Sequence, residues 1–195
     1  MGWLVWCGLH SLLVSTMFTR WLATFGGRAV ALHRLFYVVF SSLTLLPLLH
    51  RQYSLAAVTL FGWHGYWRML QVMLLGYGVS MILAGARSYD IAYFIGIRQW
   101  RQYRRGERPS GPVLHRNGVL AWVRHPWYSG GLALLWGAGP ITDVTLVIHT
   151  LLSVYVLIGI RLEERKLELE LGECYRHYRR QVPMLFPWKG LDGSR

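Results

Sequence analysis

The chain has 195 residues, of which 53% are hydrophobic, and its mean hydropathy is +0.29. This composition excludes an ordinary soluble domain and is typical of a protein with several membrane spans. The net charge of +12 would indicate nucleic-acid binding in a soluble protein, but here Lys and Arg flank apolar segments. That pattern favours contact with anionic lipid at the cytosolic face and argues against a nucleic-acid partner. Cys7 and Cys174 lie far apart, with no CxxC or Cys/His spacing, so neither a disulfide framework nor a metal site is predicted.

The first predicted membrane helix covers residues 3–19. It has no basic stretch before it and no cleavage site, so we interpret it as an uncleaved span. His10, Ser11 and Ser15 form a small polar patch on this helix. Polar groups inside a bilayer either serve a function or bond one helix to another, and both interpretations stay open here.

Two further spans are predicted at residues 29–49 and 69–86. The loop between them is rich in aromatic side chains, which favour the membrane interface: Phe61, Trp63, Tyr66 and Trp67. Residues 87–103 read as an amphipathic stretch and residues 104–112 as a polar linker.

The last two apolar segments should form a hairpin. The apolar run from Gly131 is interrupted after about ten residues, which at 1.5 Å per residue is too short to cross a core of about 30 Å comfortably. The next span covers residues 144–160, and a charged helix follows it from Arg161 to about Val182. The hairpin returns Arg161 to the membrane face at which the preceding apolar helix begins.

Basic residues set the predicted topology. Lys and Arg number 3 in residues 20–34, 2 in 51–68, 8 in 87–124, none in 139–143 and 8 from 161 onward. The alternation places the first, third and last groups in the cytosol. We therefore predict an all-α fold, a polytopic membrane helix bundle of about five transmembrane helices with a cytosolic C-terminal amphipathic helix. The bundle would form a single domain over residues 1–195, with the N-terminus outside.

Before the hairpin stands the stretch Arg124-His125-Pro126-Trp127-Tyr128-Ser129-Gly130. It combines a fixed cation, a titratable ring and a phenol, and Pro126 forces a turn before the next helix. Such side chains either build a binding site or anchor the chain in the headgroup layer, and both interpretations stay open.

An acidic residue lies on the apolar stripe of the charged helix. On a helical wheel Glu164 falls near the centre of that stripe, Glu163 at its edge, and Glu168 and Glu170 outside it. A carboxylate that faces the interior must be paired. Arg124 and Arg161 are the candidate partners: Glu164 either closes the hairpin as an ion pair or binds a cationic ligand. The other residues of the same stripe are apolar or aromatic: Leu167, Leu171, Tyr175 and Tyr178.

These motifs carry a family resemblance. Arg124-His125-Pro126-x-Tyr128-x-Gly130, followed by Glu163-Glu164, Leu171-Gly172-x-x-Tyr175-x-x-Tyr178 and Val182-Pro183, resembles the integral-membrane methyltransferases related to isoprenylcysteine carboxyl methyltransferase. The first half, with His10-Ser-Leu-Leu and Tyr89-Asp90, is similar to the bacterial branch that includes methanethiol S-methyltransferase and NnrU-like proteins.

The resemblance implies S-adenosylmethionine as methyl donor and a small membrane-partitioning acceptor, a thiol or a lipid, without a metal. It implies a multi-pass protein of a bacterial inner membrane, with the spans of residues 1–103 on the substrate side and residues 113–187 binding the cofactor. Arg161 and Glu164 would be catalytic, and His10, Tyr89 and Asp90 are weaker candidates for substrate contact. The residues that would line the cofactor are Gly118, Arg124, His125, Pro126, Tyr128, Glu163, Glu164 and Tyr175.

Two alternatives remain at this point. Membrane NADPH-dependent reductases of the sterol or fatty-acyl type have a similar Arg-His-Pro-x-Tyr-x-Gly segment, although an acid usually follows that glycine and Gly131-Leu132 follow it here. The carboxylate pair also suits a sulfonium donor better, because it attracts positive charge. A non-enzymatic membrane protein that binds a cofactor is the other alternative.

Overall fold

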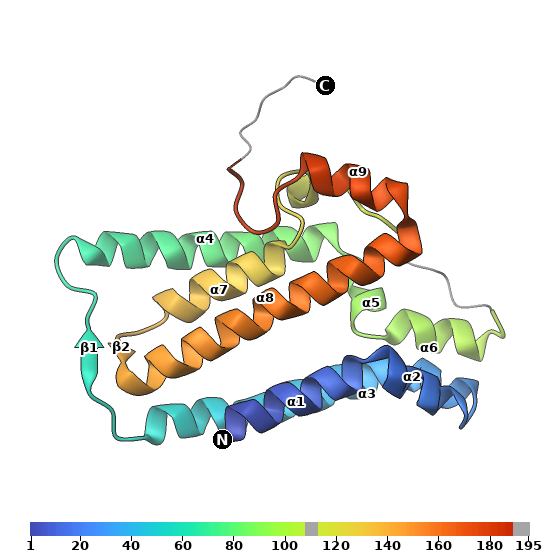
Figure 1. Cartoon of the computed structure of the whole chain (residues 1–195), viewed down its shortest axis with the longest axis horizontal. Coiled ribbons are helices and arrows are strands. Elements are labelled where there is room, and N and C mark those ends of the chain that lie inside the picture. Colours follow the sequence, from blue (N-terminus) through green and yellow to red (C-terminus); the bar gives the residue numbers. More distant parts are fainter. Residues whose placement is uncertain (108–112, 189–195) are drawn as a thin grey trace. The chain divides into compact units, whose positions relative to one another are not determined.

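The computed structural model describes residues 1–107 and 113–188 (Figure 1). The chain divides into two compact units, and each is described by itself. The first unit contains Met1–Ala56 and the described part of Asp90–Gly111. The second contains Ala57–Tyr89 and the described part of Pro112–Arg195. The single domain over residues 1–195 stays a prediction.

The first unit is helical. Its elements are α1 (Gly2–Val14), α2 (Thr16–Ala23), α3 (Gly27–Ser54), α5 (Ile91–Phe94) and α6 (Ile97–Arg104). Polar and aromatic side chains join α1 to α3: Trp6 Nε1 donates to Thr44 Oγ1 at 3.0 Å, and the Tyr37 hydroxyl lies 2.5 Å from His10 Nε2.

The predicted first helix is continuous over residues 3–19, and this prediction is wrong at Ser15. There the backbone is extended, with φ −62° and ψ 146°, and α1 and α2 meet at a bend of 53°. The Ser15 hydroxyl stabilises the break, because it donates to the Leu12 carbonyl at 2.8 Å and accepts from the Phe18 amide at 3.1 Å. Ser15 is therefore the N-cap of α2.

The second unit holds two short strands and most of the remaining helices. Its elements are β1 (Thr59–Phe61), α4 (Trp67–Ser88), the 3₁₀ helix η1 (Gly118–Ala121), α7 (Pro126–Gly137), β2 (Ile141–Thr142), α8 (Asp143–Leu171) and α9 (Glu173–Gln181). In Figure 1, α7 lies beside α4.

The aromatic loop before α4 contains a strand that the sequence did not predict. β1 pairs antiparallel with β2, and Thr59 faces Thr142. Two side-chain bonds reinforce this pairing: Trp63 Nε1 donates to the Gly139 carbonyl at 2.8 Å, and Asp143 Oδ1 accepts from the Val58 amide at 3.0 Å. The start of α4 and the turn between α7 and α8 therefore lie at the same end of this unit.

Glycines let α4 and α7 approach closely. A Cβ on Gly130 of α7 would lie 2.7 Å from the carbonyl oxygen of Gly78 on α4, and one on Gly85 of α4 would lie 2.5 Å from the Trp127 ring. A Cβ on Gly137 would lie 3.2 Å from the Cβ of Leu74, also on α4. The seven-residue spacing of Gly78 with Gly85, and of Gly130 with Gly137, presents small residues along one face of each helix. This contact fixes the start of α7 near the end of α4.

The last span and the charged helix are one helix as far as Leu171. The predicted helix from Arg161 to about Val182 is wrong at Gly172, where φ is +58° and ψ is −132°. Only glycine adopts this conformation readily, so α8 ends there and α9 starts in a new direction. Tyr175, Tyr178 and Val182 are nevertheless buried together, against Leu114, Leu167 and Leu171.

Among the described residues, three helices are long and apolar enough to cross a membrane: α3, α4 and α8. The bent pair α1 and α2 passes the same test as one broken span. At 12 residues α7 is about 18 Å long, short of a 30 Å core, as the sequence predicted. The protein is thus a nearly all-helical membrane protein, and the count of five spans stays a prediction.

Candidate functional site

The predicted motif forms the loop and first turn of α7, at the end of α4. Pro126 occupies the first position of α7, where a backbone N–H would have no partner within the helix, so its missing N–H costs nothing. His125 precedes it with non-helical backbone angles. Arg124 and His125 are 8% and 4% exposed, so both side chains point into the protein. The motif therefore builds an interior site, and the interpretation as a headgroup anchor is wrong for these two residues.

Glu164 of α8 meets Arg124 in a buried ion pair. Arg124 Nε and Nη2 lie 2.7 and 2.6 Å from Glu164 Oε1. His125 Nε2 lies 3.2 Å from the same oxygen. Glu164 is 3% exposed, so its charge depends on these partners. Of the two arginines that the sequence left open as partners, Arg124 is the one that the structure pairs with Glu164.

The two carboxylate oxygens of Glu164 differ in their surroundings. Oε1 accepts all three short contacts from Arg124 and His125. Oε2 has Arg179 Nε at 3.8 Å as its partner, beyond hydrogen-bond distance. Oε2 is thus the less satisfied oxygen and the one with capacity for a further donor.

Arg124 also binds the end of α9. Its Nη1 donates to the carbonyl of Arg179 at 3.0 Å and to the carbonyl of Val182. The backbone adds two bonds: the Arg124 amide donates to the Pro183 carbonyl at 3.0 Å, and the His125 amide to the Met184 carbonyl at 3.1 Å. The chain after α9 therefore runs alongside the motif before α7.

Tyrosines surround the ion pair. The Tyr128 hydroxyl donates to Glu163 Oε2 at 3.1 Å, and the Tyr89 hydroxyl donates to the Arg124 carbonyl at 3.3 Å. Burial raises the pKa of Tyr89 well above its usual value, so its hydroxyl stays protonated. Tyr89 thus lies at this site, where the sequence had proposed it only as a weak substrate contact.

Two tyrosines of α9 differ in how their hydroxyls are satisfied. The Tyr178 hydroxyl donates to the Leu120 carbonyl at 2.6 Å, and burial raises its pKa to about 12. Tyr175 is 1% exposed, and its hydroxyl has no hydrogen-bond partner among the described residues. Burial, and next the charge of Glu164, raise the pKa of Tyr175, so it remains a neutral donor. A buried hydroxyl without a partner is uncommon, and a bound ligand or an ordered water is a usual explanation.

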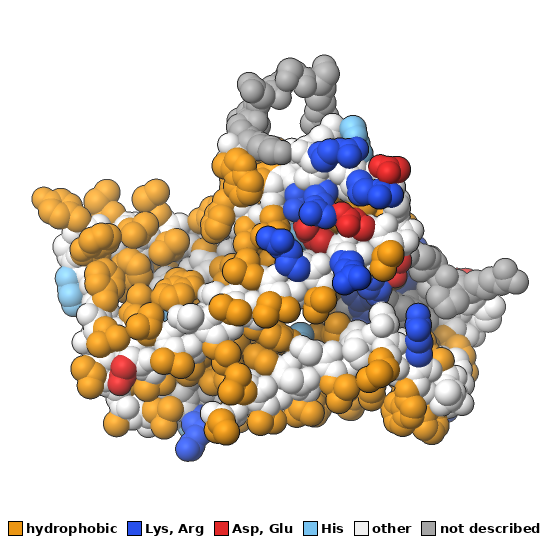
Figure 2. All heavy atoms as spheres, in the orientation of Figure 1, with side chains coloured by type: hydrophobic (Ala, Val, Ile, Leu, Met, Phe, Trp, Pro, Cys, Tyr) orange, Lys and Arg blue, Asp and Glu red, His pale blue; other side chains and the backbone are white. Residues whose placement is uncertain are grey.

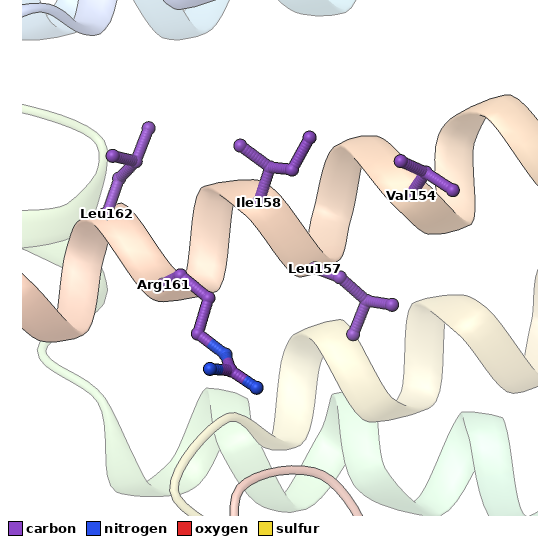
Figure 3. A pocket seen from close by; sticks show the side chains of 5 residues that line it. All are labelled: Val154, Leu157, Ile158, Arg161 and Leu162. Atoms are coloured by element: carbon purple, nitrogen blue, oxygen red, sulfur yellow. The ribbon is translucent and has the colours of Figure 1, made fainter.

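Arg161 lies apart from the ion pair, on the exposed surface of α8. It lines a hollow of about 350 Å³ together with four aliphatic residues of the same helix: Val154, Leu157, Ile158 and Leu162. Figure 3 shows Arg161 and Leu157 on one side of α8, with Ile158 and Leu162 on the other. Within residues 1–107 and 113–188, no ion pair of the Arg161 guanidinium is present.

The other predicted residues have structural contacts. Gly118 begins η1 with φ +61°, and a Cβ there would lie 2.7 Å from the Ser88 hydroxyl. His10 and Asp90 belong to the first unit. There His10 contacts Tyr37, and Asp90 caps α5 and pairs with Arg98 at 2.6 Å.

Sequence reasoning missed three residues of this region. Arg179 pairs with Glu168, which the wheel had placed among solvated surface charges. Tyr77 and Ser129 form a 2.7 Å hydrogen bond between α4 and α7. Their partners lie 11 and 52 positions away and across a helix break or a loop, so no local pattern points to them.

Curated proteins resemble this chain over most of its length. This chain is 34% identical over 182 residues to methanethiol S-methyltransferase 2 of Bradyrhizobium diazoefficiens. The matched region covers 91% of this chain and 68% of that protein. The chain is 30% identical to a methanethiol S-methyltransferase of a Pseudomonas species, covering 95% of this chain and 71% of the relative. The rat protein-S-isoprenylcysteine O-methyltransferase is 30% identical over 58% of this chain and 42% of its own length.

No protein-family model and no solved structure matches the chain. The chain spans about two thirds of the length of the methanethiol S-methyltransferases that it matches. Both the bacterial relatives and the rat enzyme agree with the resemblance carried by the Arg-His-Pro motif and the paired glutamates. The chain therefore belongs to the methanethiol S-methyltransferase family.

Proposed function

We propose that this protein is a membrane methyltransferase that transfers a methyl group from S-adenosylmethionine to a small thiol. The observation that carries the proposal is the similarity, over more than 90% of the chain, to relatives named for methyl transfer to methanethiol. The buried site at the start of α7 supports it, because it gathers carboxylates, phenols and a fixed cation at one place.

The residues present fit this methyl donor. S-adenosylmethionine supplies a methyl group on a positively charged sulfur and carries an amino acid end. Among the described residues, Glu164 Oε2 has only Arg179 Nε at 3.8 Å, so it can accept a hydrogen bond from a positively charged group, and the unpartnered Tyr175 hydroxyl can donate to an acceptor atom. Glu163, exposed and bonded to Tyr128, adds a second negative charge. We propose that these residues bind the donor, with His125 and Pro126 forming the wall at the start of α7.

Arg161 is our candidate for the acceptor side. A thiolate is a far better nucleophile than a thiol, and a nearby cation lowers the pKa of the thiol. Arg161 offers an exposed guanidinium in an aliphatic hollow, one helical turn before Glu164. The Leu157 side chain, on the same side of α8, would contact the alkyl group while the guanidinium stabilises the thiolate sulfur. Arg161→Gln should then move the rise of rate with pH to higher pH and leave donor affinity unchanged, whereas Arg165→Gln should do neither.

The basic surface supports a cytosolic site. Figure 2 shows Lys and Arg side chains gathered over α9 and the end of α8, with acidic side chains among them. We propose that this surface faces the cytosol and anionic headgroups of a bacterial inner membrane, because such lipids attract Lys and Arg next to a span. The soluble donor would then reach the site from the cytosol and the acceptor from the bilayer.

Calorimetric titration of the purified protein tests the proposed donor. S-adenosylhomocysteine and S-adenosylmethionine should bind without added metal, and a chelator should leave binding unchanged. With S-adenosylmethionine present, added methanethiol should be converted to dimethyl sulfide, with release of S-adenosylhomocysteine and a proton. Binding of NADPH, but of neither sulfur compound, would favour the reductase alternative.

A further inference from the structure

The chain after α9 is fixed to the site by backbone and side-chain hydrogen bonds. We call residues Val182–Leu185 the C-terminal strap. Its Pro183 and Met184 carbonyls accept from the backbone amides before α7. The Leu185 carbonyl accepts from the Tyr77 hydroxyl at 3.3 Å, and the Leu185 side chain is 6% exposed. The strap is therefore attached both to the motif and to α4.

The Arg124 guanidinium lies between the strap and Glu164. An arginine has five N–H donors. Nε and Nη2 face Glu164, and Nη1 donates to the carbonyls of Arg179 and Val182. This leaves one N–H without an assigned acceptor, on a side chain that is 7% exposed. Arg124 thus has little capacity to bind a ligand directly.

The acceptors of Arg124 explain what the residue can do. The last carbonyls of α9 have no partner within the helix, so a cation there is favourable. Because the planar guanidinium is rigid, fixing one edge on these carbonyls also fixes the edge that holds Glu164 Oε1. Oε2, which none of these bonds uses, is then held in a fixed orientation as well.

We propose that Arg124 is a positioning residue, and that the C-terminal strap is the element through which it holds Glu164 in its binding orientation. The inference rests on the proposed function only where donor affinity is measured. It assigns a role in the site to a segment that carries no catalytic side chain, and it refines the expectation that Arg124 lines the cofactor.

A double-mutant cycle tests the coupling of Arg124 to the strap. Arg124→Lys keeps the charge beside Glu164 but cannot bridge it to the α9 carbonyls. Leu185→Ala loosens the strap and leaves Arg124 intact, and Leu169→Ala is the matched control, since Leu169 is 82% exposed. We expect each of the first two changes to weaken S-adenosylhomocysteine binding, Arg124→Lys about tenfold, and the double variant to be within about twofold of Arg124→Lys alone. Losses that multiply would overturn the proposal.

Hydrogen exchange gives a second measurement that needs no donor. The amides of Arg124 and His125 donate to the strap, so a peptide containing them should exchange slowly in the native protein. Leu185→Ala and Arg124→Lys should both accelerate this exchange, and Leu169→Ala should not. Unchanged exchange in both variants would overturn the proposal that Arg124 and the C-terminal strap act together. Exchange could behave as expected while neither the native protein nor any variant bound S-adenosylhomocysteine. That result would contradict the proposed function and leave the role of the C-terminal strap standing.

Discussion

At the scale of single residues, the pairing of Glu164 with Arg124 dominates the site. Both are buried, so removing one charge leaves the other without its partner in a poorly solvated place. Glu164→Gln should therefore lower the free energy of unfolding by about 3–5 kcal/mol and also weaken donor binding. Denaturant unfolding in detergent measures the first effect and calorimetry the second.

Glu170→Gln is the control for that change. Glu170 pairs with Lys166 at 3.8 Å on the surface of α8, and exposed pairs of this kind contribute about 0–1 kcal/mol. Equal losses of stability in the two variants would mean that the buried pair is worth no more than a surface pair. Donor affinity that stayed unchanged in folded Glu164→Gln protein would leave Glu164 with a structural role only.

Tyr175 and Tyr178 provide a matched pair on one helix. Tyr175→Phe removes a buried hydroxyl that lacks a partner, so apo stability should stay the same or rise, because an unsatisfied group is costly to bury. If that hydroxyl binds the donor, affinity should fall about threefold to tenfold, the worth of one hydrogen bond. Tyr178→Phe should instead lower stability, by about 0.5–1.5 kcal/mol, because it loses the hydrogen bond to the Leu120 carbonyl. Thermal unfolding and calorimetry on both variants separate the outcomes, and unchanged donor affinity in Tyr175→Phe would contradict its binding role.

The sequence predicted part of this site at the residue scale. Helical periodicity placed Glu164 inside, and the hairpin predicted that Arg124 could reach it from 40 positions away. Periodicity could not choose between Arg124 and Arg161, because that choice depends on how α8 rotates against α7. The unpartnered Tyr175 hydroxyl is likewise invisible in a sequence, since an unmade bond is a property of packing.

At the scale of elements, the close contact of α4 with α7 depends on Gly130 but not on the adjacent Gly131. Gly130→Ala would place a Cβ 2.7 Å from a backbone oxygen of α4, which can move only if the helices separate. We expect it to lower stability by about 1–3 kcal/mol. Gly131 has nothing within 4 Å of its Cβ position, so Gly131→Ala should be neutral or stabilising through helix propensity. Thermal unfolding of the two variants compares them, and similar effects would mean that the close approach is not important.

Element types were predictable from hydropathy, but their ends and pairings were not. The spans at 29–49, 69–86 and 144–160 lie within α3, α4 and α8. The breaks at Ser15 and Gly172 each depend on one residue, a hydroxyl that caps a helix and a glycine with positive φ. Both residues also occur inside helices, so neither alone marks an end. The pairing of β1 with β2 joins segments about 80 residues apart, beyond the reach of any local pattern.

At the scale of the whole molecule, the two ends of the second unit differ in how many basic residues they carry. One end holds β1, β2 and the turn at residues 139–143, which contains no Lys or Arg. The other holds the Arg124–Glu164 pair and the basic residues of α9. Because α4 and α8 are both long enough to cross a membrane, these ends should face opposite sides of it. The positive-inside rule then predicts that the site faces the cytosol.

Reporter fusions test this orientation. A reporter after Arg105 and one at the C-terminus should both indicate the cytosol, and one within residues 52–60 should indicate the outside, because β1 pairs with the turn between α7 and α8. The prediction does not require α7 itself to cross: its 12 residues end against Leu74 on α4, and the chain beyond Gly137 leads to β2, which pairs with β1. Fusions within 52–60 and at the C-terminus that indicated the same side would contradict the crossing of α4 and α8. Opposite sides for Arg105 and the C-terminus would instead contradict the cytosolic assignment of residues 87–124, and with it the route by which a soluble methyl donor reaches Glu164.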